Sequence, residues 1–175
     1  MLVPIALFAA ALHAAAPATP DSAARVAAAP KRLAAGSADS IVLEKKKHTL
    51  TLFAAGAPVR SYLVALGNPA GDKQRQGDRR TPEGVFRIDS RNPGSKYHLA
   101  LHISYPDAAH AASAKAKGVS PGGDIMIHGL APQFAAAGAL HRTHDWTEGC
   151  IALTNDEIEE IWIAVRDGTP IQIKP

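Results

Sequence analysis

The chain has 175 residues, of which 46% are apolar and 20% charged, and its formal net charge is +3 at pH 7. This length is typical of one domain with some residues left for a leader. The weak positive charge excludes the strongly basic surface of a nucleic-acid-binding protein. With one cysteine, no internal disulfide can form, and the lone thiol is either buried and inert or chemically active.

Residues 1–16 are predicted to be a secretory signal peptide. An apolar run over residues 2–12 precedes the small-residue stretch 13–16, which suits a signal peptidase, although no Lys or Arg comes before the run. The run is shorter than the roughly 20 residues that span a bilayer. Residues 17–39 are rich in Ala and Pro and are interpreted as a linker, which leaves 40–175 as the folded domain. We therefore expect export to the periplasm or cell envelope.

From Ser40 onwards the sequence has the pattern of short strands. Leu50 and Leu52 alternate with polar residues, and Gly56-Ala57-Pro58 predicts the turn of a hairpin. A polar loop then covers residues 70–84. The expected strands cover residues 41–43, 48–53, 59–66, 85–88, 98–104, 124–128 and 169–173.

Two segments predict helices. Residues 107–117 are Ala-rich and lie between Pro106 and Gly118. Residues 156–166 have one apolar face at helical spacing, and Thr154 with Glu157 fits a capping box at the start. The pattern as a whole predicts a mostly β domain with one or two short helices.

Cys150 is a candidate nucleophile. It follows Gly149, which allows a tight turn, and it precedes a capped helix whose N-terminus could help to hold a thiolate. A cysteine nucleophile also needs a base. His128 ends an apolar strand and should point from the sheet edge into a cleft. His141 and His144 are rival bases in a polar loop, where simple exposure is the alternative.

Three ordered motifs carry a resemblance. Ile127-His128-Gly129, a loop, and the stretch 147–155 (Thr-Glu-Gly-Cys-Ile-Ala-Leu-Thr-Asn) resemble the L,D-transpeptidase catalytic domain family. That family has a His-Gly, a loop, then Ser/Thr-His-Gly-Cys and an Asn. Residues 77–86 resemble its G-D-x-x-T-P-x-G-x-F stretch, and residues 167–171 resemble its closing segment. The resemblance covers roughly residues 40–175.

The resemblance implies a β-sandwich-like domain with its active site in a cleft. Cys150 would attack the carbonyl of a peptidoglycan stem peptide and form a thioacyl-enzyme. His128 would take the thiol proton and later activate an acceptor amine, and the carbonyl of Gly129 would orient His128. Backbone amides near Gly149 and Cys150 would form the oxyanion hole.

Two positions depart from the family pattern. Glu148 stands where the family usually has His, and Ala152 stands where it often has Arg. An anionic Glu148 beside Cys150 would disfavour a thiolate unless it points away or pairs with a cation such as Arg142.

The candidates for substrate binding are Arg142, Thr147 and two arginines of the polar loop, Arg79 and Arg80. Stem peptides end in carboxylates, which arginine can grip with two hydrogen bonds. The alternative for this loop is a solvated structure in which Asp78 pairs with one of the arginines.

Three functions remain open from the sequence. The first is a transpeptidase that uses an amine acceptor, including one on a wall-attached protein; the second is a carboxypeptidase or amidase that uses water. The third is a zinc-binding or non-catalytic wall-binding module with ligands among His128, His141, His144 and Cys150, whose spacing matches no standard zinc pattern. We expect a monomer that acts on stem peptides, with no cofactor, no metal and no nucleic-acid partner.

Overall fold

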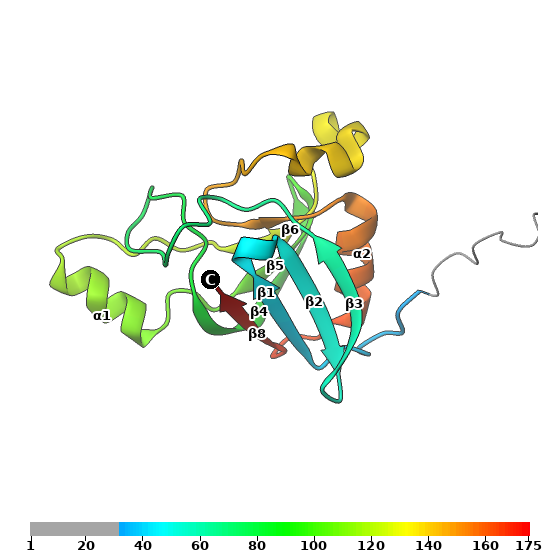
Figure 1. Cartoon of the computed structure of the whole chain (residues 1–175), viewed down its shortest axis with the longest axis horizontal. Coiled ribbons are helices and arrows are strands. Elements are labelled where there is room, and N and C mark those ends of the chain that lie inside the picture. The colour runs from blue at the N-terminus through cyan, green and yellow to red at the C-terminus, as the bar shows by residue number, and fades with distance from the viewer. Residues whose placement is uncertain (1–31) are drawn as a thin grey trace, which may run out of the picture. The chain divides into compact units, whose positions relative to one another are not determined.

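The computed structural model describes residues 32–175 (Figure 1). The predicted signal peptide and residues 17–31 of the predicted linker lie outside the described residues. The linker's last residues are bonded to the domain: the amides of Gly36 and Ala38 donate to the carbonyls of Ile163 and Ala164, at 2.9 and 3.0 Å. The ordered domain therefore begins a few residues before Ser40.

The described residues form one mixed sheet of eight strands, in the order β3-β2-β1-β8-β4-β5-β6-β7. β1 pairs with β8, and β6 with β7, in parallel; the other neighbours are antiparallel. The strands are β1 Ser40–Glu44, β2 Thr49–Ala54, β3 Ala57–Leu63, β4 Gly84–Ser95, β5 His98–Ile103, β6 Met126–His128, β7 Ile151–Ala152 and β8 Pro170–Lys174.

β4 joins the two halves of the sheet. Its first residues pair with β8 and its later residues pair with β5, with register shifts between Ile88 and Ser90 and between Asn92 and Ser95. Such bulges bend a strand and increase its twist. The bend in β4 helps to curl the sheet, and the prediction of a mostly β domain is confirmed.

Two α-helices flank the sheet, α1 Ala108–Ala116 and α2 Asn155–Ala164, and in Figure 1 they lie on different sides of it. α1 begins after Asp107, whose side chain accepts a hydrogen bond from the His110 amide. α2 begins with the predicted capping box of Thr154 and Glu157. Two 3-10 segments, η1 Lys45–Lys47 and η2 Pro132–Thr143, complete the elements.

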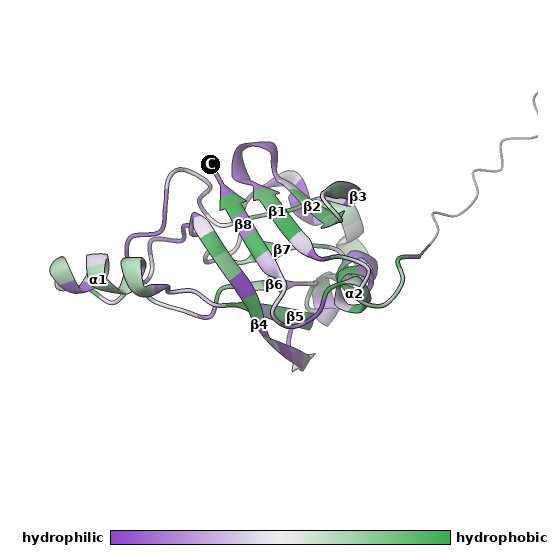
Figure 2. Cartoon of the chain, turned by 90° about the horizontal axis from the view of Figure 1, so that it is seen from below, coloured by the Kyte–Doolittle hydropathy of each residue, from purple (hydrophilic) through white to green (hydrophobic). Residues whose placement is uncertain are grey.

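The core lies between the strands and α2. Figure 2 shows apolar residues concentrated along β1, β4 and β8. Leu50 and Leu52 are fully buried, as the alternation in their strand predicts, and Ile158 and Ile161 bury the apolar face of α2. Within the described residues no helix is long and apolar enough to cross a membrane.

Three local predictions were wrong. The hairpin turns at Ala55 and Gly56, both with positive φ, so β3 begins at Ala57. β4 runs to Ser95, because hydrogen bonds with β5 stabilise a polar segment that lacks a strand pattern. The loop after His128 contains η2, whose Ala-rich sequence has no regular apolar face.

Candidate active site

The sheet register brings Cys150 and His128 to one face. β7 pairs in parallel with β6, Ile151 opposite Ile127 and Ala152 opposite His128. Cys150 directly precedes β7 and therefore falls opposite Met126. Because side chains alternate along a strand, Cys150 and His128 project to the same side from neighbouring strands. Two residues separated by the segment 129–149 are thus brought together by backbone pairing.

A tight turn presents Cys150. Gly149 has φ +121°, a conformation that favours glycine. A Cβ on Gly149 would lie 2.6 Å from the Arg80 carbonyl oxygen, so the turn packs directly on the polar loop. The Thr147 hydroxyl donates to the Cys150 carbonyl at 2.8 Å and accepts from the Gly149 amide at 3.2 Å. Thr147 therefore stabilises this turn. Because the Gly149 amide already donates to Thr147, the Cys150 amide is the remaining candidate donor for the oxyanion hole.

His128 is buried, with 3% of its surface exposed. Its Nδ1 lies 2.7 Å from the Gly129 carbonyl oxygen. Because a carbonyl only accepts, Nδ1 carries the proton and Nε2 is left as an acceptor when the ring is neutral. The geometry of the predicted Gly129 contact is therefore present.

Gly129 is itself held from several directions. Its amide donates to the Leu99 carbonyl at 3.2 Å, and the Asn155 side chain accepts from the Leu130 amide at 2.8 Å. A Cβ on Gly129 would lie 2.6 Å from Asn155 Oδ1 and 3.0 Å from the Tyr97 carbonyl oxygen. Glycine is required here by this close approach, and Asn155 links α2 to the segment that orients His128.

Two aromatic residues pack on the His128 ring. The Tyr97 ring lies 4.5 Å from it, centroid to centroid, and the Trp146 ring lies 5.8 Å away in an edge-to-face arrangement. Trp146 is placed by its neighbours: Asp145 accepts from the Leu66 amide at 2.8 Å, and the Thr147 amide donates to the Leu66 carbonyl at 3.0 Å. These rings restrict the orientations open to His128.

Burial favours the neutral forms of both candidate catalytic groups. It raises the pKa of the Cys150 thiol, as do Asp124 and Glu148, while the Met126 amide and Lys73 act in the opposite direction. Burial also lowers the pKa of His128, and the hydrogen bond to Gly129 opposes this. Both shifts favour the uncharged forms, a thiol at Cys150 and a neutral imidazole at His128. The thiol makes a weak contact with the Asp124 carbonyl at 3.5 Å.

The carboxylate of Glu148 points into solvent and pairs with Arg79. The two side chains are 74% and 49% exposed, and Arg79 Nε lies 3.2 Å from Glu148 Oε1. Arg142, which the sequence suggested as a partner for Glu148, instead forms an ion pair with Glu157 of the α2 capping box. The anionic charge beside Cys150 is thus offset by the polar loop.

A buried lysine anchors this polar loop. Lys45 is fully buried and donates to the carbonyls of Gly71 and Thr81, at 2.6 and 2.9 Å, and to the Glu83 carboxylate at 2.9 Å. All three ammonium hydrogens therefore have acceptors. Lys45, which directly follows β1, thus binds the loop near both of its ends, at Gly71 and at Thr81 and Glu83.

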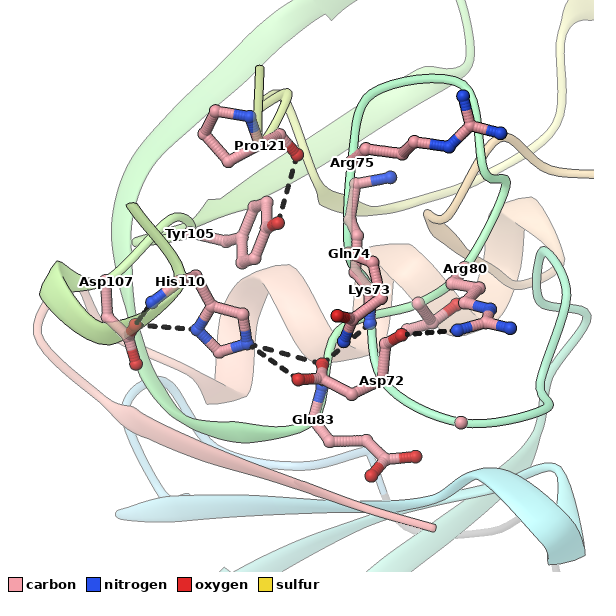
Figure 3. A network of polar contacts seen from close by, with 12 residues as sticks. Asp72, Lys73, Gln74, Arg75, Arg80, Glu83, Tyr105, Asp107, His110 and Pro121 are labelled. Carbon is pink, nitrogen blue, oxygen red and sulfur yellow. Dashed lines mark hydrogen bonds and ion pairs between the residues drawn. The ribbon is translucent and has the colours of Figure 1, made fainter. Parts of the chain in front are cut away.

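A second network fixes the loop from inside (Figure 3). Asp78 pairs with the buried Lys73 at 2.8 Å rather than with an arginine. Burial alone would raise the pKa of Asp78, but Lys73 and three backbone amides lower it to about 2. Asp72 accepts from the Glu83 amide at 2.8 Å and faces His110 at 3.2 Å, while its carbonyl accepts from Arg80 at 3.1 Å. The loop is an ordered structure.

The two rival histidines differ in exposure. His144 is exposed as expected, but His141 is buried, with 8% of its surface exposed, because η2 folds back against Trp146. Burial lowers the pKa of His141 to about 4, helped by Arg142. Within residues 32–175 no group of three or more His, Cys, Asp or Glu side chains is placed to hold a metal ion.

Comparison with known proteins identifies the family of this chain. The model of the L,D-transpeptidase catalytic domain family, YkuD, matches residues 38–173. The chain belongs to this family. YafK of Escherichia coli (strain K12) is homologous, at 30% identity over 169 residues. The match covers 93% of this chain, which spans 59% of the length of YafK.

Solved structures share the fold. The helical cell shape determining protein Pgp2 from Campylobacter jejuni superposes with a TM-score of 0.60 at 24% identity, covering 84% of this chain and 53% of that one. An L,D-transpeptidase from Mycobacterium smegmatis superposes with a TM-score of 0.52 at 19% identity, covering 79% and 59%. At these identities the likeness concerns the fold alone.

Several residues of this L,D-transpeptidase domain were missed by sequence reasoning. Tyr97 and Trp146, which pack on His128, stand among polar residues with no pattern to single them out. Lys45 is one of three consecutive lysines, and nothing in that run distinguishes it from its exposed neighbours. Asn155 was part of the family motif, but its contact with Leu130 depends on tertiary structure.

Proposed function

We propose that this domain is a peptidoglycan L,D-transpeptidase that forms a thioacyl-enzyme on Cys150 and transfers the acyl group to an amine acceptor. The observation that carries the proposal is the contact between His128 and the Gly129 carbonyl. Its Nδ1 is held by the Gly129 carbonyl at 2.7 Å, and the register places its ring on the same face as Cys150. Nε2 is then the atom available to take the thiol proton.

In the first half-reaction the Cys150 sulfur attacks the carbonyl carbon of a stem peptide while its proton passes to His128 Nε2. The tetrahedral oxyanion is stabilised by the Cys150 amide. The C–N bond then breaks, and the proton on His128 goes to the leaving amine. This leaves a thioester on Cys150 and a neutral His128.

In the second half-reaction an acceptor amine attacks the thioester carbon and gives a proton to His128 Nε2. The C–S bond breaks, and the sulfur recovers the proton from His128. If water replaces the amine, the same steps yield a free carboxylate, and the domain is a carboxypeptidase or amidase. The carboxylate of Glu148 is exposed beside Cys150, and this polar surface would allow water to reach the thioester.

The substrate contacts belong to the same proposal. Arg79 and Arg80 lie on the ordered loop that packs against Gly149, and we propose that they bind carboxylates of the stem peptide. Arg142 and Thr147 are weaker candidates, since Arg142 pairs with Glu157 and Thr147 stabilises the Cys150 turn. We also propose that the acceptor is a second stem peptide or a wall-attached protein, and that the protein is exported to the cell envelope as a monomer.

The test is intact-mass spectrometry of the protein incubated with a tetrapeptide-bearing wall fragment or with a carbapenem. We expect an adduct on Cys150, release of the terminal amino acid, and a cross-linked product when an amine acceptor is supplied in excess. Cys150→Ala should form no adduct. If neither compound adds mass while the thiol stays reduced, the covalent mechanism is wrong; an adduct followed only by hydrolysis assigns the hydrolase.

A further inference from the structure

Polar contacts attach α1 to the polar loop of residues 70–84. Ala114 alone among the residues of α1 is buried, and the helix projects away from the sheet in Figure 1. Three contacts join α1 and the segment after it to the loop: His110 with Asp72, Lys117 with Gln74, and the Ser120 carbonyl with the Gln76 amide at 2.8 Å. The first of these contains a group that titrates near neutral pH.

His110 lies between two carboxylates. Its Nδ1 is 2.6 Å from Asp107 Oδ1, and its Nε2 is 3.3 and 3.2 Å from the two carboxylate oxygens of Asp72 (Figure 3). Because a carboxylate only accepts, both contacts are hydrogen bonds only when both ring nitrogens carry a proton. The arrangement therefore fits an imidazolium. A neutral ring would turn a nitrogen lone pair towards one of the carboxylates.

The other groups around His110 do not offset these two charges. The rings of Tyr105 and Phe86 pack against the imidazole, at 5.1 and 5.8 Å between centroids. Burial raises the pKa of Tyr105 to about 12, so its hydroxyl stays neutral near pH 7. Lys73 lines a small cavity together with His110, but its ammonium is paired with Asp78 at 2.8 Å.

Folding favours the protonated form of His110. Burial lowers the pKa of His110, but hydrogen bonds and charges from Asp107 and Asp72 outweigh burial and raise the pKa above its ordinary value of 6.5. The folded protein therefore holds this proton more tightly than the unfolded chain. By linkage, the stabilisation is fully present below pH 6.5 and is lost as the pH rises through the pKa of His110 in the folded protein.

The contact with Asp72 is the one that deprotonation breaks. Asp107 is close to His110 in sequence and also accepts from its backbone amide at 2.8 Å, so a neutral ring keeps its proton on Nδ1. Nε2 then faces Asp72 without a hydrogen. A cavity of about 220 Å³ is lined by both residues, which allows water to separate them. Asp72 still accepts from the Glu83 amide at 2.8 Å and so remains part of the loop.

We propose that His110 is a pH-sensitive latch, which ties α1 to Asp72 as an imidazolium and releases the helix from the polar loop when it loses a proton. The loop itself stays in place, because Lys45 and Lys73 hold it through separate contacts. The latch does not depend on the proposed function, since neither Cys150 nor His128 takes part in it.

The test follows the full chain by NMR at about pH 6 and about pH 9, on either side of the range in which a histidine with a raised pKa titrates. The ring signals of His110 should give a pKa above 6.5, and the amide signal of Glu83 should shift with the same midpoint. The hydrogen-exchange protection factors of α1 should fall about fivefold between the two pH values, as expected for loss of one partly exposed charge-assisted hydrogen bond.

His110→Gln cannot gain a charge and should make the protection of α1 equal at both pH values. Asp72→Asn keeps an acceptor for the Glu83 amide and should lower the pKa of His110 and remove most of the pH dependence. The matched control is His102→Gln, because His102 pairs with Asp89 between β5 and β4; the pH dependence should persist in it.

A pKa of His110 at or below 6.5 overturns the proposal, as does equal protection of α1 at both pH values in the unmodified chain. A fall in protection that persists in His110→Gln, or that disappears in His102→Gln, also overturns it. If His110→Gln does not fold, the pKa of His110 in the unmodified chain and in Asp72→Asn decides the question, since a latch requires the pKa to drop in the variant.

Discussion

The carbonyl oxygen of Arg80 occupies the space where Gly149 lacks a side chain, 2.6 Å from the position of a Cβ atom. This contact joins the polar loop to the turn that carries Cys150. The same loop touches Gly67, where a Cβ would lie 2.0 Å from the Arg79 carbonyl oxygen and 2.7 Å from the Gly149 amide. Three backbone segments, at Gly67, Arg79–Arg80 and Gly149, therefore meet next to Cys150.

Gly149→Ala should greatly reduce the rate of Cys150 acylation. The added methyl group meets backbone atoms that cannot move independently, and φ +121° is strained for alanine. The measurement is adduct formation by mass spectrometry, with circular dichroism as a check of folding. Gly118→Ala is the matched control, since Gly118 has φ +67° with nothing near its Cβ position. It should cost about 1 kcal/mol of stability and leave acylation intact; an equal loss in both variants would contradict the packing argument.

Lys45→Met should destabilise the fold by about 3–5 kcal/mol, because it leaves the Glu83 carboxylate and the carbonyls of Gly71 and Thr81 without their shared donor. Urea unfolding measures this. Lys46→Met is the matched control, since Lys46 is exposed and its loss should change the free energy of unfolding by less than about 0.5 kcal/mol. A change below 1 kcal/mol for Lys45→Met would show that the loop does not depend on this anchor.

The pH dependence of Cys150 alkylation should reveal a neutral resting pair. Burial raises the pKa of the thiol above its ordinary value of 9.0, so the rate with iodoacetamide should be low at pH 7 and should rise only above pH 9. His128, whose pKa is lowered below 6.5 by burial, stays neutral over that range. Enzyme activity should therefore fall only as the pH drops below 6.5. A low-pH plateau of alkylation that disappears in His128→Ala would instead indicate a thiolate–imidazolium pair.

Arg79→Ala should slow alkylation of Cys150 by up to about fivefold, because it leaves the Glu148 carboxylate unpaired near the thiol. Glu148→Gln should accelerate it by a similar factor. In the double variant the loss of Arg79 should have little further effect, which a double-mutant cycle measures. If Arg79→Ala acts equally in both backgrounds, the two side chains are not coupled. The stability of each variant should change by less than about 1 kcal/mol, since both side chains are well exposed.

Local patterns were sufficient to predict much of this fold. The alternation of Leu50 and Leu52 predicted a half-buried strand, and Thr154 with Glu157 predicted the start of α2. The polar end of β4 was not predictable in this way, because its strand conformation depends on pairing with β5, which local propensity does not encode. The Ala-rich η2 likewise depends on its packing against Trp146.

The candidate site, too, was predictable only where local sequence or a motif determines it. Cys150, His128 and Gly129 were predicted from their chemistry and from the family motif; the structure sets Cys150 and His128 on neighbouring strands and brings His128 Nδ1 to the Gly129 carbonyl, and their catalytic roles stay a prediction. The burial of His141 was missed because a histidine among polar residues normally stays in solvent, and here the contact with Trp146 removes it. The pairing of Arg142 with Glu157 rather than Glu148 was also not predictable from the sequence, because Glu157 lies 15 positions further along the chain and the tertiary fold decides which carboxylate Arg142 meets.

The position of β8 affects the order in which the domain can assemble. This strand lies between β1 and β4, so residues 170–174 connect two halves of the sheet, and Ile41 pairs with Ile171 at the other end of the domain. Contacts between such distant positions form slowly. A nascent chain that has made β1 to β7 still lacks the strand that lies between β1 and β4. The sheet therefore closes only after residues 170–174 have been synthesised.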